Sequence, residues 1–330
     1  MYDNPYHNCD LSKFTFLVTG GAGFIGSNIV AYLLRYGAGK VRVLDNFSTG
    51  FRKNLLAFEH HPAFELLEGD IRDADVCSKA VQGVDYISHQ AALGSVPRSV
   101  NDPLTTNAVN VTGFLNMLSA VKESGRVQRL VYAASSSTYG DSQELPKVEE
   151  RIGRPLSPYA VTKYINELYA DVFAKTYGLE LIGLRYFNVF GPKQSPAGEY
   201  AAVIPMFIQA VKENRPAFIN GDGEQTRDFT FVQNAVQANI RAFFVDNDAA
   251  INQVYNVACG EQVSLNQLWS LITENEKIFI QAQHRADRIG DVRHSIADIS
   301  KAQRLLGYAP DVMFQKGLAI TMDSFGDADI

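Results

Sequence analysis

The chain has 330 residues, enough for one large domain or two modest ones, each with its own core. Hydrophobic residues make up 46% and charged residues 20%, and the net charge of -6 argues against a nucleic acid or an anionic membrane as the main partner. The sequence lacks both a bilayer-spanning apolar run and a signal peptide at residues 1–8. Three scattered cysteines exclude a disulfide framework and a CxxC metal site. We therefore expect a cytoplasmic protein without a metal.

The first segment with a clear pattern lies at residues 14–26. Residues 1–13 are polar and are expected to form an arm, ordered only if something packs on it. The run 14–19 is rich in strand formers, and a glycine-rich turn and a helical pattern to about Gly37 follow it. In this context glycines let the backbone approach a pyrophosphate at the free N–H groups of the helix, although a turn without a ligand is the alternative. The candidate cofactor contacts are Gly20, Gly23, Phe24, Ile25 and Gly26.

A second strand, residues 41–44, ends in Asp45. A carboxylate about 20 residues beyond the glycines can accept hydrogen bonds from the adenosine ribose, and it would repel a 2'-phosphate. Since no arginine follows before Arg52, NAD is favoured over NADP; a turn cap is the structural alternative for Asp45. The neighbouring candidate contacts are Asn46, Phe47, Ser48 and Gly50.

Further strands are predicted at 64–68, 84–89 and 129–134, and a long helix at 104–124. Strands alternating with helices at this pace predict an α/β fold, a Rossmann-type doubly wound parallel sheet with ligands at the carboxyl ends of its strands. The candidate cofactor contacts in this stretch are Asp70, Ile71, Gln90, Ala91, Ala92 and Asn107.

Tyr159 and Lys163 lie four residues apart on a predicted helix over 157–177, so they share one face. An ammonium one turn away favours the phenolate and lowers the pKa of a tyrosine, which makes the pair a candidate acid/base catalyst. Alone the pattern is weak, because a half-buried tyrosine beside a solvated lysine is common. The fifth strand delivers three serines to the same crevice, and Ser135 or Ser136 could share a proton with Tyr159 or could simply cap a turn.

With these residues in view, the sequence resembles the extended short-chain dehydrogenase/reductase family, specifically its nucleotide-sugar 4-epimerases, and most of all those acting on UDP-N-acetylglucosamine. The resemblance extends from about Phe14 to about residue 310. It rests on the glycine turn, the acid after the second strand, the serine run, the Tyr-xxx-Lys pair and the stretch 184–192. It implies NAD as cofactor, with Tyr186 and Val189 as further contacts.

The resemblance also implies a role for each catalytic candidate. Tyr159 is the base, Lys163 binds the nicotinamide ribose and lowers the pKa of Tyr159, and Ser135, or else the adjacent Ser136, assists. Phenolate Tyr159 takes the proton of the sugar 4-hydroxyl while NAD takes the hydride, and the transient 4-keto sugar turns over before hydride returns to its other face. The reaction is then a reversible 4-epimerisation without net NAD consumption.

After Pro192 the alternation breaks. The resemblance implies an NAD-binding domain of residues 14–191 and 230–257 and a smaller, discontinuous α/β substrate domain of residues 192–229 and 258–330. The return to the sheet is predicted as a helix through Ala235 and Phe244, then a strand at 253–257.

The UDP-sugar contacts come from the resemblance as well. Arg227 and Arg288 suit a diphosphate because guanidinium groups make paired, charged hydrogen bonds, and Asp291 would hold the uridine ribose. The other candidates are Ser95, Ser135, Ser136, Tyr159, Asn188, Ala202, Val203, Ile204, Asn220, Gly221 and Ser295. The chain departs from its relatives at Met206, where Lys is frequent, and at Gln233 and Asn234, where acids are frequent.

Ser295 bears on the identity of the sugar. Relatives limited to plain hexoses carry a bulky tyrosine at this place, whereas a serine leaves room for an N-acetyl group. UDP-N-acetylglucosamine and UDP-N-acetylgalactosamine are therefore favoured over UDP-glucose and UDP-galactose, with 2-acetamido uronates as a variant.

The sequence leaves three rival functions to consider. A 4,6-dehydratase would carry an Asp-Glu pair after the assisting hydroxyl, where this chain has Ser136 and Ser137. A sugar-acid decarboxylase is less easily excluded, and a non-catalytic NAD-binding sensor would usually lack the Tyr-xxx-Lys pair. The helices at 104–124 and 157–177 imply a homodimer by resemblance, and synthesis of surface polysaccharide is the expected pathway.

Overall fold

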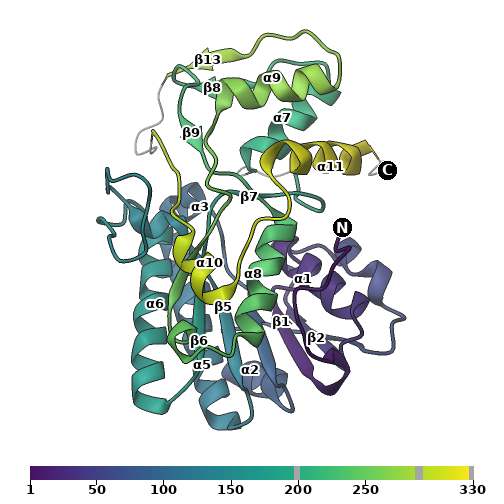
Figure 1. Ribbon diagram of the computed structural model, residues 1–330, viewed down its shortest axis with the longest axis vertical. Helices are drawn as coiled ribbons and strands as arrows, with labels where there is room; N and C mark the ends of the chain where they lie inside the picture. The colour runs from purple at the N-terminus through teal and green to yellow at the C-terminus, as the bar shows by residue number, and fades with distance from the viewer. Residues whose placement is uncertain (197–200, 287–292, 327–330) are drawn as a thin grey trace.

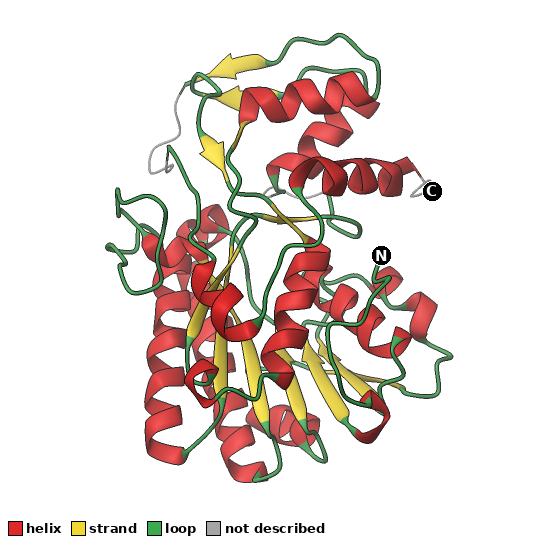
Figure 2. Cartoon of the chain, in the orientation of Figure 1, coloured by secondary structure: helices red, strands yellow, loops and turns green. Residues whose placement is uncertain are grey.

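The computed structural model describes residues 1–196, 201–286 and 293–326. A parallel sheet of seven strands lies between helices in the larger part, and a smaller part of helices and short strands stands above the carboxyl ends of the strands (Figures 1 and 2). The strand order is β11-β6-β5-β4-β1-β2-β3. The strands are β1 (Thr15–Thr19), β2 (Lys40–Asp45), β3 (Phe64–Glu68), β4 (Tyr86–His89), β5 (Arg129–Ser135), β6 (Leu181–Tyr186) and β11 (Val254–Val257).

This order confirms the predicted doubly wound sheet. The chain runs outward from β1 to β3 in one direction and from β4 to β6 in the other, so the order reverses between β1 and β4. Connections on the two sides of this point leave in opposite directions and open a crevice at the carboxyl ends of the strands. The predicted return is present too, since β11 pairs with β6 in parallel at the edge of the sheet.

Helices cover both faces of the sheet. The core on one face contains residues of α1 and α8, and the core on the other contains residues of α2, α5 and α6. The helices of this part are α1 (Phe24–Arg35), α2 (Ala74–Val81), α3 (Val96–Asn101), α4 (Pro103–Asn107), α5 (Gly113–Ser124), α6 (Pro158–Tyr177), α8 (Val232–Phe244) and α10 (Ser300–Leu306). The helix predicted at 104–124 is interrupted by a π-helical turn at Ala108–Thr112. Short 3-10 turns lie at Leu11–Lys13, Arg52–Asn54, Leu56–Phe58, Ser136–Tyr139 and Asp248–Ala250.

Helix α6, which carries Tyr159 and Lys163, has clear local signals at both ends. The Ser157 side chain accepts a hydrogen bond from the Ala160 N–H at the N-terminus, and Pro158 occupies the first turn. Gly178 ends the helix with a φ of 71°, a left-handed conformation that glycine adopts without steric cost. These caps set where the helix begins, and therefore where its second residue, Tyr159, stands relative to the sheet.

The smaller part has its own hydrophobic core, with Phe207 and Trp269 in edge-to-face contact. Its elements are β7 (Val189–Phe190), α7 (Val203–Lys212), β8 (Phe218–Asn220), β9 (Thr226–Arg227), β10 (Thr230–Phe231), β12 (Val263–Ser264), α9 (Leu265–Asn275), β13 (Gln283–Arg285) and α11 (Phe314–Gly326). The strands pair as β7 with β10, β9 with β12 and β8 with β13, so each pair joins segments distant in sequence. The late helix α10 lies instead against α8 and β11 of the larger part.

The arm of residues 1–13 packs on α1 and α8. Tyr2 and Tyr6 are each only 4% exposed, and the Tyr6 ring stacks on Tyr32 at 5.3 Å between centroids. Gln233 Nε2 donates to the Tyr6 hydroxyl at 2.9 Å. The arm was expected to be ordered only if it packs on another segment, and it does pack on α1 and α8. Gln233, where relatives often carry an acid, holds it in place.

Candidate active site

A cleft of about 600 Å³ lies at the carboxyl ends of the sheet strands. It is lined by the glycine turn, by the residues that follow β2, β3, β4 and β5, by α6, and by the residues after β6. The predicted contacts found there are Gly20, Gly23, Phe24, Ile25, Gly26, Asp45, Asn46, Ser48, Gly50, Asp70, Ile71, Gln90, Ala91, Ala92, Ser135, Ser136, Tyr159, Lys163, Tyr186, Asn188, Val189 and Ala202.

The glycine turn is packed too tightly for side chains. A Cβ on Gly26 would lie 2.2 Å from the Gly20 carbonyl oxygen, and one on Gly20 would lie 2.7 Å from the Ala91 nitrogen. Gly20 also has a φ of 68°, which disfavours any other residue. The N-terminus of α1 lacks a side-chain cap at Gly23, so its N–H groups face the cleft as donors for an anion. This cradle fits the pyrophosphate of a dinucleotide.

Asp45 lies where a ribose would follow that pyrophosphate. Its side chain is 7% exposed, and its two oxygens accept hydrogen bonds from the Ala22 N–H at 2.9 Å and the Phe47 N–H at 2.8 Å. Burial raises the pKa of Asp45, and the two backbone donors oppose that effect. The remaining lone pairs are available to ribose hydroxyls.

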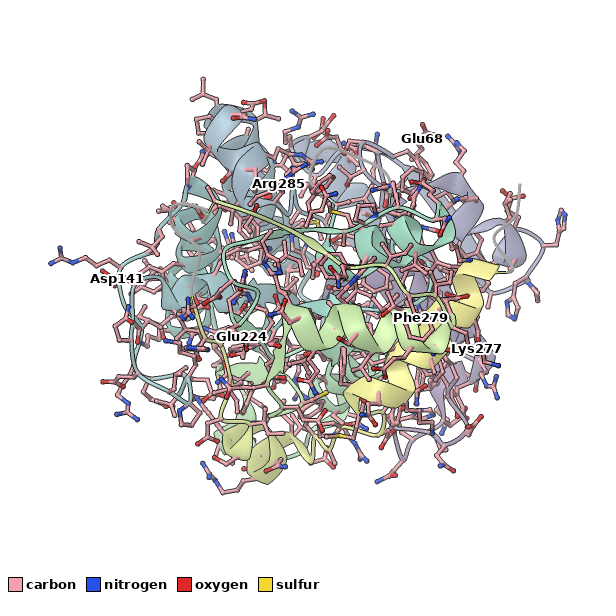
Figure 3. All side chains as sticks on the ribbon, turned by 90° about the horizontal axis from the view of Figure 1, so that it is seen from above. Glu68, Asp141, Glu224, Lys277, Phe279 and Arg285 are labelled. Carbon is pink, nitrogen blue, oxygen red and sulfur yellow. The ribbon has the colours of Figure 1, made fainter. Side chains whose placement is uncertain are left out.

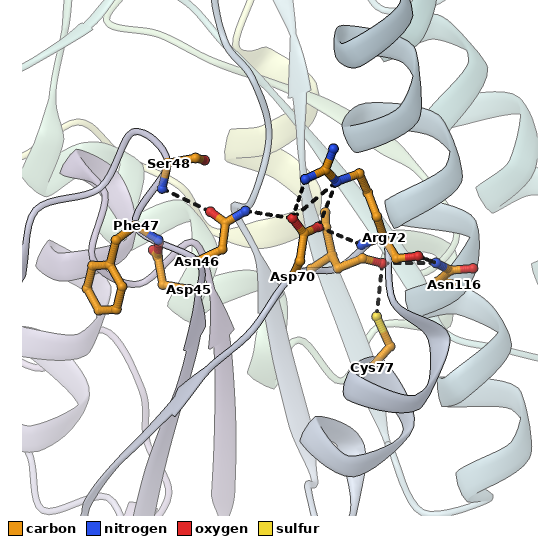
Figure 4. Close-up of polar contacts among 9 residues, drawn as sticks. Asp45, Asn46, Phe47, Ser48, Asp70, Arg72, Cys77 and Asn116 are labelled. Atoms are coloured by element: carbon orange, nitrogen blue, oxygen red, sulfur yellow. Dashed lines mark hydrogen bonds and ion pairs between the residues drawn. The ribbon is translucent and has the colours of Figure 1, made fainter.

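The adjoining corner of the cleft is held by a network around Asp70 (Figure 4). Asn46 Nδ2 donates to Asp70 at 2.8 Å, and the Arg72 guanidinium binds both carboxylate oxygens. Hydrogen bonds from Arg72 lower the pKa of Asp70 to about 2. The Ile71 carbonyl accepts hydrogen bonds from Cys77 Sγ and Asn116 Nδ2, so this segment is fixed from both sides.

The catalytic candidates meet where β5 ends. Ser135 is 8% exposed and Lys163 is 4% exposed, and Lys163 Nζ donates to the Ala133 carbonyl oxygen at 2.7 Å. The Ser135 hydroxyl accepts a hydrogen bond from the Ser137 N–H and interacts with the Tyr159 side chain, lowering the pKa of that tyrosine. Ser136 also lines the cleft, but Ser135 is the serine that interacts with Tyr159.

Burial, rather than Lys163, has the largest effect on the pKa of Tyr159. Burial raises the pKa of Tyr159, and the interaction with Ser135 only partly opposes this. The Lys163 ammonium is directed to the Ala133 carbonyl, and burial lowers its own pKa to about 8. Spacing on a helix placed the two residues on one face, but it could not say how strongly burial acts on each of them.

Asn107, Phe47 and Ser95 are among the predicted contacts that do not line the cleft. Asn107 is exposed on α4, whereas Asn110 is buried and exchanges hydrogen bonds with the backbone of Leu93, a residue of the cleft wall. Phe47 contributes its N–H to Asp45, and its ring lies 4.1 Å from the Arg52 guanidinium carbon. Ser95 caps α3 by accepting from the Arg98 N–H.

Sequence reasoning also missed part of the cleft wall. The missed residues are Leu44, Thr49, Gly69, Leu93, Gly94, Val109, Ala133 and Ala134. Most directly adjoin a predicted contact at a strand end, so extending each motif by one or two residues would have found them. Val109 carries no such signal, because it depends on the π-helical turn after α4.

The predicted substrate contacts lie farther from the sheet. Asn188 is exposed in the cleft with a strained φ of 36°, and its Nδ2 donates to the Asp228 carbonyl oxygen at 3.0 Å. Ala202 lines the cleft, but Val203 starts α7 and Ile204 is 1% exposed in the core of the smaller part.

The remaining candidates lie outside the cleft wall. Asn220 ends β8, and the N–H of the next residue, Gly221, donates to the Arg285 carbonyl oxygen at 2.8 Å. Arg285 is labelled in the view from above in Figure 3. Arg227 Nη1 donates to the Thr226 carbonyl at 2.9 Å, and the Ser295 N–H donates to that same carbonyl oxygen at 3.2 Å. Arg288 and Asp291 lie outside the described residues.

Among the described residues, no group of three or more His, Cys, Asp or Glu side chains could hold a metal ion. Likewise, no helix within the described part of the chain is long and apolar enough to cross a membrane.

Comparison with known proteins agrees with this geometry. The "NAD dependent epimerase/dehydratase family" profile matches residues 16–258. A UDP-glucose 4-epimerase of Mycolicibacterium smegmatis is 37% identical over 94% of this chain and 97% of its own length. A solved UDP-N-acetylglucosamine 4-epimerase of Methanobrevibacter ruminantium, in complex with UDP-N-acetylmuramic acid, is 38% identical with a TM-score of 0.89, covering 95% of this chain and 98% of that chain.

A third relative contains the cofactor. It is a UDP-glucuronic acid 4-epimerase of Bacillus cereus, solved with UDP-glucuronic acid and NAD, 30% identical with a TM-score of 0.87 over 95% of this chain and 99% of that one. The glycine cradle, Asp45 and the family profile lead to one conclusion: this chain belongs to the NAD dependent epimerase/dehydratase family, and NAD is its cofactor.

Proposed function

We propose that this protein reversibly inverts carbon 4 of a UDP-hexose, through a transient 4-keto sugar and with NAD held throughout the cycle. The observation that carries the proposal is the meeting of Ser135, Tyr159 and Lys163 in the same cleft as the glycine cradle. A hydroxyl, a phenol and an ammonium beside a bound nicotinamide are the groups that alcohol oxidation and ketone reduction require.

Each residue has a definite task in this proposal. When bound, NAD supplies the redox chemistry, because it can accept a hydride from carbon 4 and return it. Tyr159 takes the proton of the 4-hydroxyl and gives it back, and Ser135 orients that hydroxyl. Lys163, anchored on the Ala133 carbonyl, presents its remaining N–H donors to the nicotinamide ribose. Because burial raises the pKa of Tyr159 in the described structure, its role as a base requires positive charge supplied on cofactor binding.

The sugar must turn over between the two half-reactions while its diphosphate stays bound. We propose that Arg227, together with Arg288, anchors the diphosphate, and that Asn188 contacts the sugar. A guanidinium suits this task because it binds phosphate oxygens with two parallel hydrogen bonds. We also propose the domain division of residues 14–191 with 230–257 against 192–229 with 258–330, except that α10 packs on α8 and β11 of the larger part.

The serine run argues against elimination chemistry. Ser136 and Ser137 stand where a 4,6-dehydratase would need an acid and a base, and the Ser137 hydroxyl is bonded to Ser135 at 2.8 Å. Incubating the protein with UDP-N-acetylglucosamine, without added cofactor, and separating the products tests this point. The 4-epimer is expected; a 4-keto-6-deoxy product or the absence of any reaction with all tested UDP-hexoses would refute the proposal.

We favour UDP-N-acetylglucosamine and UDP-N-acetylgalactosamine as the substrate pair. The support is the small side chain of Ser295, whose N–H donates to the Thr226 carbonyl beside Arg227, and the similarity to the M. ruminantium enzyme. UDP-glucose and UDP-glucuronate are the alternatives, given the other two relatives. Measuring kcat/KM for UDP-N-acetylglucosamine, UDP-glucose and UDP-glucuronate decides which of these is the preferred substrate.

We also propose a homodimer formed through α6. This helix exposes Val161, Leu168 and Val172 on one face, at 44%, 49% and 52%, and neighbouring α4 exposes Leu104 at 82%. An apolar stripe at helical spacing suits pairing with a second copy of itself about a twofold axis. Sedimentation should give a dimer for the natural chain and a monomer for Leu168→Glu; a monomeric natural chain would contradict the proposal.

A further inference from the structure

Asp228 is a buried carboxylate with no place in the mechanism above. It is 0% exposed, and it follows Arg227 at the beginning of the short connection to β10. Its Oδ1 accepts a hydrogen bond from the Cys259 N–H at 3.0 Å, and its Oδ2 accepts from the Gly260 N–H at 3.1 Å and the Ala297 N–H at 3.2 Å. Segments far apart in sequence thus converge on one side chain.

The backbone of the same residue makes a further link. The Asp228 carbonyl oxygen accepts from Asn188 Nδ2, so the side chain of a cleft residue with a strained φ is tied to this point. Arg227 is the preceding residue, and Ser295 is two residues before Ala297. Asn188, Arg227 and Ser295, which we propose for the sugar, the diphosphate and the N-acetyl pocket, are therefore each bonded to Asp228 or within two residues of Asp228 or of one of its partners.

A carboxylate is suited to hold these loops together, because it accepts hydrogen bonds on both of its oxygens. Two oxygens offer about four acceptor sites, and three backbone N–H groups occupy them. An amide of the same shape would keep one oxygen and turn an NH₂ group toward N–H donors, which loses at least one bond and adds a repulsion. The surrounding loops have little regular structure of their own, since β9, β10 and β12 contain two residues each.

We propose that Asp228 is a positioning residue, which sets the spacing between Asn188, Arg227 and the loop of Ser295 and thereby the affinity for the UDP-sugar, without touching the substrate. This inference rests on the proposed function, because the three contacts are themselves assigned there. The NAD cradle and Tyr159 are built on other elements, so the turnover of bound substrate and the NAD content should depend little on Asp228.

The test compares Asp228→Asn with a matched control, Asp85→Asn. Asp85 is also a buried carboxylate, 5% exposed, that accepts from a backbone N–H, that of Thr15, but it lies at the opposite, amino end of the sheet. For Asp228→Asn we expect about a tenfold rise in KM and in the Kd for UDP, since one or two hydrogen bonds are lost. The kcat should change by less than about threefold and the NAD content should stay the same. For Asp85→Asn neither KM nor Kd should change.

Equal losses in the two variants, or a fall in kcat with KM unchanged, would overturn the positioning role. A second measurement on the natural chain covers the case in which Asp228→Asn does not fold. Adding UDP should slow hydrogen exchange at residues 257–261 and 295–298 together with 226–230, because one carboxylate joins them. Slowing confined to 226–230 would equally overturn the role. If the natural chain bound no UDP at all, the proposed function itself would fail.

Discussion

The two walls of the cleft differ in how they are built. On the sheet side, most of the predicted NAD contacts stand at the end of a strand or in the turn or helix that follows it, and a continuous seven-stranded ladder holds these ends together. On the opposite side, strand pairs of two or three residues join segments far apart in sequence, and a single carboxylate, Asp228, ties several of them. A wall of the first kind is rigid by topology, whereas the second depends on individual side chains.

This difference predicts separable defects. Substitutions on the sheet side should affect NAD binding or turnover, and those on the loop side should affect the choice of sugar and its affinity. Substitutions in the N-terminal arm, outside the cleft, should affect only stability.

The largest effect is expected where the two walls meet. Tyr159→Phe removes the group that carries the proton, so kcat should fall by about 10²–10⁴-fold while UDP binds as before. Product separation gives kcat, and calorimetry gives the affinity. If turnover were unchanged, another group would have to be the base.

The next largest effect is expected on the sheet side alone, as a loss of bound NAD. In Gly26→Ala the new Cβ would lie 2.2 Å from the Gly20 carbonyl oxygen, so the cradle must open and the purified protein should lose most of its NAD. NAD released by acid from each protein measures this. The control is Gly125→Ala, where the added methyl meets nothing within 4 Å and only a φ of 58° is strained. It should cost about 1 kcal/mol in stability and retain NAD. Equal NAD loss in both would show that the cradle is not specifically required.

A smaller effect is expected on the loop side. Ser295→Tyr should lower kcat/KM for UDP-N-acetylglucosamine by about 10- to 100-fold and spare UDP-glucose, because a filled pocket excludes the N-acetyl group. Ser270→Tyr, an exposed position on α9, should change neither value. Parallel losses for both sugars in Ser295→Tyr would show that this residue does not select the sugar.

The smallest effect is expected at the arm. Tyr6→Phe removes the acceptor for Gln233 Nε2 but keeps the ring stacked on Tyr32, so the free energy of unfolding should fall by about 1 kcal/mol. Thermal unfolding measures the loss, and kcat should be unchanged. The same change at Tyr177, which is 48% exposed, should have no effect on stability. A lower kcat in Tyr6→Phe would mean that the arm acts on the cleft.

Much of the sheet side could be predicted because its signals are local. The strand before Gly20, the glycine turn and the helix after it are contiguous, and the wound sheet brings each strand end to the same edge. The place of Asn107 outside the cleft wall has a local cause as well, since a π-helical turn follows that residue and Asn110 is the asparagine that turns inward.

The loop side could not be predicted in the same way. Nothing near Asp228 in the sequence points to the N–H groups of Cys259, Gly260 and Ala297, because those contacts depend on how distant loops pack. The pKa of Tyr159 could not be predicted for a related reason. Helical spacing gives the neighbour Lys163, but burial, which raises the pKa, is a property of the assembled cleft.

By itself, then, the sequence determined the α/β fold, the NAD cradle and the candidates for the acid/base pair, because short periodicities and steric limits at glycine act over a few residues. The tertiary structure decided which serine interacts with Tyr159, where Lys163 directs its charge, how the arm is held and how the sugar wall is assembled. Those outcomes depend on burial and on hydrogen bonds between segments that only the folded chain brings together.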